Sequence, residues 1–267
     1  MLNICISGAT GWTGAELVRG VLAASDMTLT GAVARRAAGQ DIGTAIGDEA
    51  AGLIVTPTLE QAFEQPCDVL IEYTHPDYGM TNTLSAIERG IPVILGTTGF
   101  TATDIDKIDD AARAVGVGVV TGNFALCAAL AQHFSLFAAK HIEQFEIIDY
   151  AASTKPDAPS GTAGELAELL GDVRKPKLDL PIDQTIGPEE IRGASINGVQ
   201  VHSVRLPSYL LAVESIFAQS GERLVIRHEA GSSAVPYVFG TLLAARRIGD
   251  IRGVVRGLDK LLFTENQ

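Results

Sequence analysis

The sequence predicts an α/β fold: a doubly wound parallel sheet, followed by a second, α+β domain that contains an open mixed or antiparallel sheet. In residues 1–124, short apolar runs alternate with amphipathic stretches, a pattern typical of parallel strands that helices cover on both faces. In residues 125–235, apolar runs follow one another across short turns, and Ser220-Gly221 between two of them indicates a hairpin. We expect residues 236–267 to form helices that pack back on the first domain.

The elements of the first domain follow from apolar content and spacing. The run VLIEY at Val69–Tyr73 is short and mostly apolar, as a strand buried on both faces should be. Helical spacing puts Ile105, Ile108 and Ala112 on one face of a predicted helix. The predicted strands are Leu2–Ser7, Met27–Ala34, Val69–Tyr73, Pro92–Leu95 and Gly118–Val120, and the predicted helices are Gly14–Ala24, Tyr78–Arg89 and Ala102–Val115.

The second half of the chain has longer β-rich runs. Segment 171–188 is rich in Pro, Asp and Lys, and we expect it to be irregular. The predicted strands are Phe145–Ala151, Val199–Arg205, Leu210–Gln219 and Leu224–His228, and the predicted helices are Cys127–Ile142, Ala163–Leu170, Val235–Arg246 and Ile251–Leu262.

Composition narrows the class of protein. With 267 residues, 46% of them hydrophobic, the chain can bury a sizeable core, and its net charge of −12 argues against a nucleic-acid or membrane partner. No apolar run approaches the ~18 residues of a membrane span, and the start MLNICISGATG is unlike a secretion signal, so we expect a cytoplasmic protein. Cys5, Cys67 and Cys127 lie in or beside apolar runs without metal-site spacing, which predicts buried thiols and no metal.

A glycine-rich loop, GATGWTG, follows the first predicted strand and opens the first helix. Its G-x-x-G-x-x-G spacing is a variant of the dinucleotide-binding fingerprint, in which small residues let backbone N–H groups approach a pyrophosphate at a helix N-terminus. We therefore predict that the loop binds a nicotinamide dinucleotide through Gly8, Thr10, Gly11, Trp12 and Thr13.

The end of the second strand predicts which dinucleotide binds. Sites that prefer NAD usually have Asp or Glu there, to bind the ribose hydroxyls. Here Ala34 is followed by Arg35 and Arg36, and an arginine is suited to a 2′-phosphate. The sequence therefore predicts NADPH, with Arg35 as the contact and NADH as the alternative.

Two further loops are expected at the carboxyl ends of strands, where ligands bind in open α/β sheets. Their Thr and Asn side chains could bond the nicotinamide carboxamide. The predicted cofactor contacts in these loops are Gly96, Thr97, Thr98, Gly122, Asn123 and Phe124.

The segment STKPDAPSGT carries a lysine that a plain connector would not need. Ser160, Gly161 and Thr162 begin a predicted helix, so hydroxyl and free N–H groups converge there, and a carboxylate of a small-molecule substrate would fit. Lys155, held between prolines, adds a positive charge and a proton. Hydride addition to C=N or to conjugated C=C–C=N leaves charge that must be protonated, which predicts Lys155 as the general acid.

The motifs IEYTHP, GTTGF, GNF and KPDAPSGTA, in this order, resemble the dihydrodipicolinate reductase family over nearly the whole chain. The resemblance implies an oxidoreductase of bacterial lysine biosynthesis that uses NADH or NADPH. It also implies a Rossmann-type domain, a substrate domain with an open sheet, and a homo-oligomer, usually a homotetramer.

The chain departs from the family pattern in its substrate half. The family has H-H-x-x-K, whereas Ala151 and Ala152 precede Lys155 here. Of the R-x-G-x-x-x-G-E-H run only Arg205 and, approximately, Glu214 match, and the arginine of H-x-A-x-S-R is replaced near Ser233 and Ala234, although His228 remains. These losses favour a different, smaller or less charged imine, and the candidate replacements for the missing acid are Tyr150, Tyr209 and His75.

Three other functions stay open at this point. One is an imine reductase or amine dehydrogenase that acts on another substrate. A second is a non-catalytic NADP sensor, because the chain has no Tyr with Lys four residues later: Tyr150 is followed at that distance by Thr154. A third is a semialdehyde dehydrogenase, with Cys127 as nucleophile and His228 as base.

Overall fold

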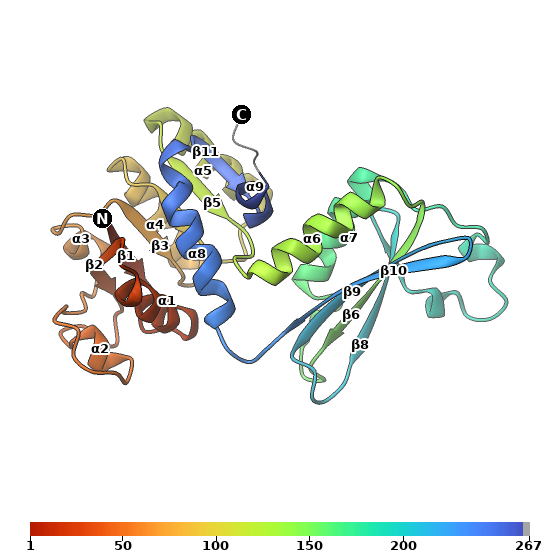
Figure 1. Cartoon of the computed structure of the whole chain (residues 1–267), viewed down its shortest axis with the longest axis horizontal. Helices are drawn as coiled ribbons and strands as arrows, with labels where there is room; N and C mark the ends of the chain where they lie inside the picture. Colours follow the sequence, from red (N-terminus) through yellow and green to blue (C-terminus); the bar gives the residue numbers. More distant parts are fainter. Residues whose placement is uncertain (264–267) are drawn as a thin grey trace. The chain divides into compact units, whose positions relative to one another are not determined.

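The computed structural model describes residues 1–263, which divide into two compact units (Figure 1). Unit 1 is Met1–Ala129 together with the segment from Ala234 onward, and unit 2 is Leu130–Ser233. Within the described residues, no helix has the length and apolarity needed to cross a membrane.

Unit 1 is built on a six-stranded parallel sheet in the order β11-β5-β4-β3-β1-β2. This order reverses at β1, as in doubly wound sheets, so the carboxyl ends of β1, β3 and β4 lie at one edge. The observed sheet confirms the predicted fold class. The strands are β1 (Leu2–Ser7), β2 (Met27–Val33), β3 (Val69–Glu72), β4 (Val93–Leu95), β5 (Gly118–Thr121) and β11 (Gly253–Arg256).

Helices cover both faces of this sheet. On one face α1 and α8 pack together and bury Leu17, Val21 and Leu242; on the other, α4 and α5 bury Ile87 and Ile108. The helices of unit 1 are α1 (Trp12–Ala23), α2 (Ile42–Ala45), α3 (Leu59–Ala62), α4 (Pro76–Glu88), α5 (Ala102–Val115), α8 (Val235–Arg247), η3 (Ile248–Asp250) and α9 (Leu258–Leu262), while α6 (Leu126–Ala139) begins in unit 1 and continues into unit 2.

The C-terminal segment differs from the prediction of one helix over Ile251–Leu262. It contains the strand β11, which pairs in parallel with β5, and then the short helix α9. Gly253 (φ +78°) and Gly257 (φ +99°) flank the strand in the left-handed region and interrupt a helix. Between them the β-branched pair Val254 and Val255 fits a sheet edge.

Unit 2 holds a five-stranded mixed sheet in the order β10-β9-β6-β8-β7. Only β6 and β8 pair in parallel, and the predicted hairpin joins β9 to β10 through Gly221 (φ +90°). The predicted irregular segment begins later than expected, because α7 continues to Val173, and it contains η1. The elements are β6 (Gln144–Ala151), α7 (Gly161–Val173), η1 (Ile182–Gln184), η2 (Glu189–Arg192), β7 (Ala194–Ile196), β8 (Val199–Arg205), β9 (Leu211–Gln219) and β10 (Glu222–Ala230).

The two faces of this sheet differ. One face packs against α6 and α7 and forms a core around Phe145, Leu166 and Phe217. The opposite face carries Ile148 and Ile216, which are half-buried, and Val225, which is 51% exposed. This second face is therefore less well covered than the first.

The three cysteines do not share one environment. Cys5 is buried in β1, but Cys67 is half-buried and Cys127, in the first turn of α6, is exposed. The prediction of buried thiols was therefore wrong for Cys127, because apolar neighbours along a helix do not tell which side of it faces the core.

Candidate active site

The glycine loop after β1 is tightly constrained. The N–H of Gly8 donates to the Val33 carbonyl at 3.0 Å, and the loop turns with φ +82° at Gly8. A Cβ atom on Gly8 would lie 2.2 Å from the Tyr73 carbonyl oxygen, and one on Gly14 would lie 2.0 Å from the Gly8 carbonyl oxygen. Only glycine fits at these two positions.

The helix that follows suits an anion. Gly11 is the N-cap of α1, no side chain caps the helix, and its first turn contains no acidic residue. The first N–H groups of α1 therefore have no acceptor within the helix or from a capping side chain, and they lie at its positive end. These features fit the pyrophosphate of a dinucleotide. Trp12 and Thr13 lie in this first turn, two residues earlier than the predicted helix start, and Thr10 is partly exposed beside them.

Trp12 is 60% exposed, and its indole ring packs edge-to-face on Tyr237 of α8, with 6.1 Å between ring centroids. This residue is exposed beside the glycine loop, where a ligand can contact it. The cofactor contact predicted for Trp12 stays a prediction.

A buried glutamate, which the sequence did not single out, joins the loop after β3 to helix α4. Glu72 at the end of β3 is 0% exposed. Its carboxylate accepts hydrogen bonds from the Thr74 N–H at 3.0 Å and from the Asn82 amide at 2.9 Å, and that amide also donates to Ser7 at 3.1 Å. Burial raises the pKa of this carboxyl. An acid that ends an otherwise apolar strand is the signal that could have identified it.

The GTTGF loop after β4 is fixed to Glu72 by its backbone. The N–H groups of Gly96 and Thr97 donate to the Glu72 carbonyl at 2.9 and 3.2 Å. Thr97 is 5% exposed, and its hydroxyl accepts the Thr74 N–H at 2.8 Å. Its side chain therefore links the loops after β3 and β4 from within the protein. Thr98 is exposed. Of the two predicted threonines, Thr98 is the one whose side chain is free to meet a ligand.

The loop after β5 contributes mainly through its backbone. Gly122 has φ +130°, and the Asn123 side-chain oxygen accepts the Ala125 N–H at 3.0 Å. The Phe124 side chain is 1% exposed and packs near Tyr73, so it supports the loop from the core. In this loop, the groups that can contact a cofactor are therefore the Asn123 amide nitrogen and the main chain.

Arg35 lies just after β2 and is exposed. Its Nη1 donates to the Tyr78 hydroxyl at 3.0 Å, and its Cζ lies 4.3 Å from the centroid of the Tyr78 ring. The Val33 carbonyl that binds Gly8 is two residues away, so Arg35 belongs to the same group of loops as the glycine loop.

In unit 2, Lys155 lies in the loop between β6 and α7. Its ammonium group is 2.8 Å from a carboxylate oxygen of Asp157, and about a third of the lysine side chain is exposed. The hydrogen bond from Lys155 lowers the pKa of the Asp157 carboxyl.

A buried ion pair anchors this loop, and the sequence did not point to its acidic member. Asp149 in β6 is 0% exposed and binds the Arg205 guanidinium at 2.7 Å. Arg205 also donates to the Asp157 carbonyl at 2.7 Å. Asp149 accepts the Ser160 N–H at 2.9 Å and the Ser160 hydroxyl at 2.6 Å. An acid within an apolar β-run is again the available signal.

The start of α7 has the predicted form. Ser160 is the N-cap, accepts the Ala163 N–H, and is 1% exposed. Because its hydroxyl donates to Asp149, the side chain is occupied inside the protein. Gly161 is exposed and Thr162 partly exposed, so their N–H groups are the parts of the predicted substrate site that a ligand can reach.

The candidate replacement acids lie in different places. Tyr150 stacks on Tyr209, with 5.2 Å between ring centroids, and burial is the main cause that raises the pKa of Tyr150. His75 belongs to unit 1, where it caps α4 by accepting the Asp77 N–H. His228, which the sequence suggested only as the base of a semialdehyde dehydrogenase, lies on β10, and burial lowers its pKa. The acid role predicted for Lys155, like those of these candidates, stays a prediction.

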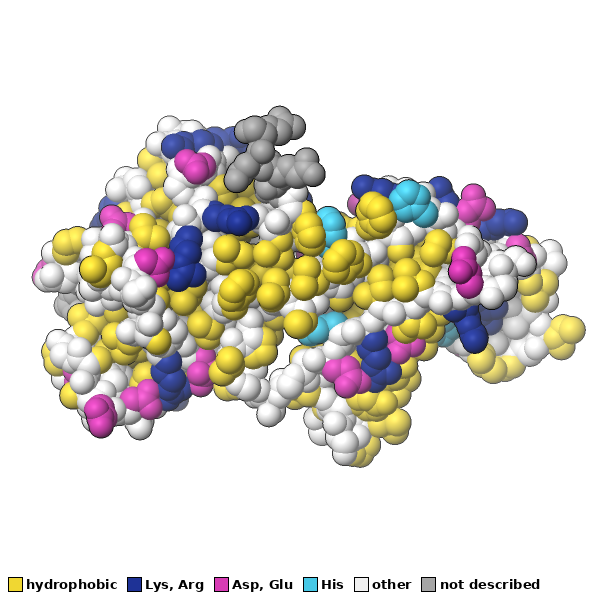
Figure 2. All heavy atoms as spheres, viewed as in Figure 1, with side chains coloured by type: hydrophobic (Ala, Val, Ile, Leu, Met, Phe, Trp, Pro, Cys, Tyr) yellow, Lys and Arg dark blue, Asp and Glu magenta, His cyan; other side chains and the backbone are white. Residues whose placement is uncertain are grey.

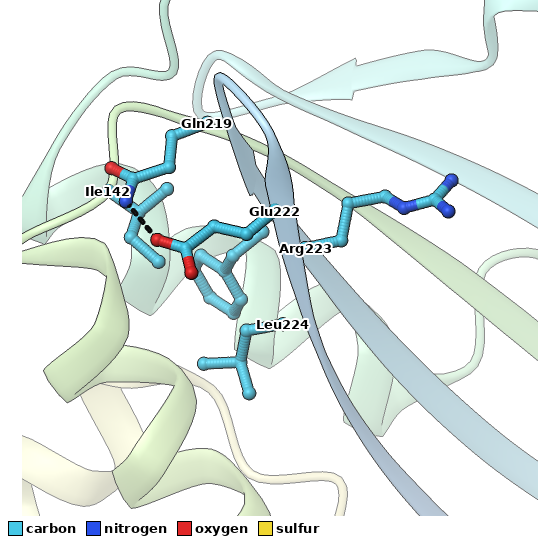
Figure 3. A pocket seen from close by; sticks show the side chains of 6 residues that line it. Ile142, Gln219, Glu222, Arg223 and Leu224 are labelled. Atoms are coloured by element: carbon cyan, nitrogen blue, oxygen red, sulfur yellow. Dashed lines mark hydrogen bonds between the residues drawn. The ribbon is translucent and has the colours of Figure 1, made fainter.

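A pocket of about 240 Å³ lies elsewhere in unit 2 (Figure 3). It adjoins the turn between β9 and β10, near the start of β6, whereas the Lys155 loop follows the end of β6. In Figure 3, Arg223 points away from it, and Gln219 bonds Glu222 across its rim. The pocket therefore does not belong to the candidate site. Its lining residues are Ile142, Phe217, Gln219, Glu222, Arg223 and Leu224.

Family models of dihydrodipicolinate reductase match nearly the whole chain: the N-terminal model matches residues 2–124, and the C-terminal model matches residues 124–262. The chain is 37% identical over 265 residues to 4-hydroxy-tetrahydrodipicolinate reductase from Moorella thermoacetica, covering 98% of each chain. It is 38% identical over 264 residues to the enzyme of the same name from Mycolicibacterium gilvum, covering 98% of this chain and 99% of that one.

A comparison with solved structures also points to dihydrodipicolinate reductase. Dihydrodipicolinate reductase from Paenisporosarcina sp. TG-14, solved with dipicolinate bound, superimposes with a TM-score of 0.84 at 28% identity, covering 97% of this chain and 99% of that one. An amine dehydrogenase from Mycobacterium smegmatis has a TM-score of 0.60 at 12% identity, covering 95% and 94%, which shows a shared fold alone.

The family models, the full-length relatives and the fold agree along the whole chain. The chain therefore belongs to the dihydrodipicolinate reductase family and is an NAD(P)H-dependent oxidoreductase of that type, an enzyme class of lysine biosynthesis.

Proposed function

We propose that this enzyme uses NADPH to reduce a carboxylated cyclic imine, or its conjugated C=C–C=N tautomer, and that Lys155 is the proton donor. The observation that carries the proposal is the Lys155–Asp157 ion pair of 2.8 Å, in a loop that leads directly into the N-terminus of α7. A cation and free helix N–H groups in one short segment suit a substrate that is both an anion and a proton acceptor.

The roles of the residues follow from their chemistry. When bound, the cofactor would supply a hydride to the imine carbon. The electron pair of the C=N bond then moves to nitrogen, and Lys155 donates a proton to that nitrogen and becomes a neutral amine. The N–H groups of Gly161 and Thr162 bind a substrate carboxylate, while Ser160, held by Asp149, fixes where the helix begins.

The first candidate substrate is 4-hydroxy-tetrahydrodipicolinate, the compound of lysine biosynthesis. The relatives from Moorella thermoacetica and Mycolicibacterium gilvum are named for it, and the Paenisporosarcina enzyme binds dipicolinate, a planar ring with two carboxylates. Ala151 is 0% exposed and Ala152 is partly exposed, and neither side chain carries a proton that it could donate. In this proposal Lys155 takes over protonation, and simpler cyclic imines are the second substrate class to test.

The test is turnover of NADPH with dihydrodipicolinate generated in situ, beside simpler cyclic imines. Lys155→Met should lower kcat about 100-fold or more, while the Kd for NADPH stays unchanged. Lys177→Met is the matched control, because Lys177 pairs with Asp179 two residues later, at 3.3 Å, as Lys155 pairs with Asp157. A Lys155→Met enzyme with the turnover of the control would refute the assigned role.

The cofactor preference is part of the same proposal. Arg35 is exposed at the end of β2 and carries the fixed positive charge that a 2′-phosphate requires. Arg35→Ala should raise the KM for NADPH and leave the KM for NADH almost unchanged. Equal use of both cofactors by the wild-type enzyme would contradict the preference.

We also propose that the enzyme acts in the cytoplasm as a homo-oligomer, with a second copy on the open face of the unit 2 sheet. Val225, Ile216 and Ile148 lie on that face. The hydrophobic side chains that gather over α6 (Figure 2) belong to the other side of this sheet and are not part of the proposed interface. Val225→Glu should shift the mass measured by light scattering to that of a monomer. Val115→Glu, on α5 of unit 1 and 49% exposed, is the control. An unchanged mass would place the interface elsewhere.

A further inference from the structure

Arg35 makes two contacts with one partner, Tyr78. The Nη1 group donates to the Tyr78 hydroxyl at 3.0 Å, and the guanidinium carbon lies 4.3 Å from the centroid of the same ring. The hydrogen bond fixes one edge of the guanidinium, and the cation–π contact fixes the guanidinium against the ring face. An exposed arginine that is held in this way differs from a freely rotating surface side chain.

Tyr78 is itself held by the start of α4. Its N–H donates to the His75 carbonyl at 2.9 Å, and the helix begins at Pro76, with His75 as its N-cap. The next residue, Gly79, packs on the GTTGF loop: a Cβ atom there would lie 3.1 Å from the Thr97 side chain. Tyr78 is therefore fixed relative to the loops that follow β3 and β4.

An unrestrained arginine loses about 2 kcal/mol of side-chain entropy when a ligand orders it. Tyr78 removes part of that loss before any ligand arrives. It uses one N–H group and one face of the guanidinium, so the other N–H groups can form charge-assisted bonds to phosphate oxygens.

We propose that Tyr78 determines cofactor specificity: it holds Arg35 in the orientation that binds the 2′-phosphate of NADPH. The inference rests on the proposed NADPH preference and adds a residue to it. If it is right, substitutions of Tyr78 weaken binding only of ligands that carry the 2′-phosphate. General damage to the fold would instead weaken binding of all nucleotide ligands.

The experiment uses two fragments that differ in this phosphate. Binding of 2′,5′-ADP and of 5′-AMP to the full chain is measured by calorimetry for the wild type, Arg35→Ala, Tyr78→Phe and Tyr78→Leu. Tyr78→Phe removes the hydroxyl and keeps the ring, whereas Tyr78→Leu removes both contacts. Arg89 lies over Phe63, 5.4 Å from its ring, at the opposite end of α4, so Phe63→Leu is the matched control.

We expect wild-type enzyme to bind 2′,5′-ADP about tenfold or more tightly than 5′-AMP, because a hydrogen bond to a charged group contributes on that scale. Arg35→Ala should abolish the difference. Tyr78→Phe should weaken 2′,5′-ADP binding about threefold and Tyr78→Leu about tenfold, with 5′-AMP binding unchanged within a factor of about two. Phe63→Leu should leave the ratio of the two affinities as it is in the wild type.

The outcomes separate the two claims. If Arg35→Ala leaves the ratio unchanged, the NADPH preference through Arg35 is wrong, and the role of Tyr78 falls with it. If Arg35→Ala abolishes the ratio but the Tyr78 variants keep it, the preference stands and only the role of Tyr78 is overturned. If the Tyr78 variants weaken both fragments equally, Tyr78 is merely structural, and the inference is likewise refuted.

Discussion

The carboxylate of Asp149 and the guanidinium of Arg205 form a 2.7 Å ion pair in which the carboxylate is fully buried. Through this pair the loop that carries Lys155 is joined to the sheet of unit 2. Arg205 binds the Asp157 carbonyl, and Asp149 binds Ser160 at the start of α7. The two charges therefore hold both ends of segment 157–160.

Loss of the cation should destabilise unit 2. Arg205→Met should lower the free energy of unfolding by about 3–5 kcal/mol, because Asp149 then stays buried without its partner. Urea unfolding measures this. Arg174 is the control: at the other end of α7 it also pairs with an acid, Glu143 at 3.6 Å, and binds a carbonyl, but it is more exposed. Arg174→Met should cost at most about 1 kcal/mol. Equal costs would contradict the role of the buried pair.

Lys155 should control the titration of Asp157. In the native protein the hydrogen bond from Lys155 keeps the pKa of Asp157 below its ordinary value of 3.8, so this contribution to stability is present above pH 3.8 and is lost as the pH falls through the lowered pKa. Lys155→Met should move the pKa of Asp157 up toward that ordinary value. Carbon-13 NMR of the carboxyl group follows the titration, and an unchanged pKa would show that the pair does not form in solution.

Glu72 should make stability depend on pH in the opposite direction. Burial raises its folded pKa above the ordinary 4.5, so its contribution is fully present below pH 4.5 and is lost as the pH rises through the raised pKa. A glutamine amide does not titrate. The free energy of unfolding of Glu72→Gln, relative to that of the wild type, should therefore be higher at about pH 8 than at about pH 4. Urea unfolding at both values tests this, and a difference that is the same at both would contradict it.

Gly8 and Gly39 separate backbone strain from steric overlap. Both have a left-handed backbone, with φ +82° and +84°, but a Cβ atom on Gly39 meets nothing within 4 Å, whereas one on Gly8 lies 2.2 Å from the Tyr73 carbonyl oxygen. Gly39→Ala should cost about 1–2 kcal/mol of stability. Gly8→Ala should cost about 1–3 kcal/mol more and weaken NADPH binding. Thermal unfolding and calorimetry measure the two effects, and equal stability costs would mean that the loop can shift to make room.

Local sequence patterns were sufficient for much of the fold. Alternating apolar runs predicted five of the parallel strands of unit 1, and Ser220-Gly221 predicted the hairpin between β9 and β10. The C-terminal strand β11 was missed, because its four residues form a strand only by pairing with β5. So short a segment carries too little periodicity to distinguish a strand from a helix turn.

By itself, the sequence determined the glycine loop, the serine that caps α7 and the lysine before it, because each depends on residues close together in the chain. Tertiary structure alone decided that Glu72 and Asp149 are buried and hydrogen-bonded, and that Arg35 meets Tyr78, 43 residues away. The reason is physical: burial and ion pairing depend on which strands become neighbours and in what register, and local preferences do not specify either.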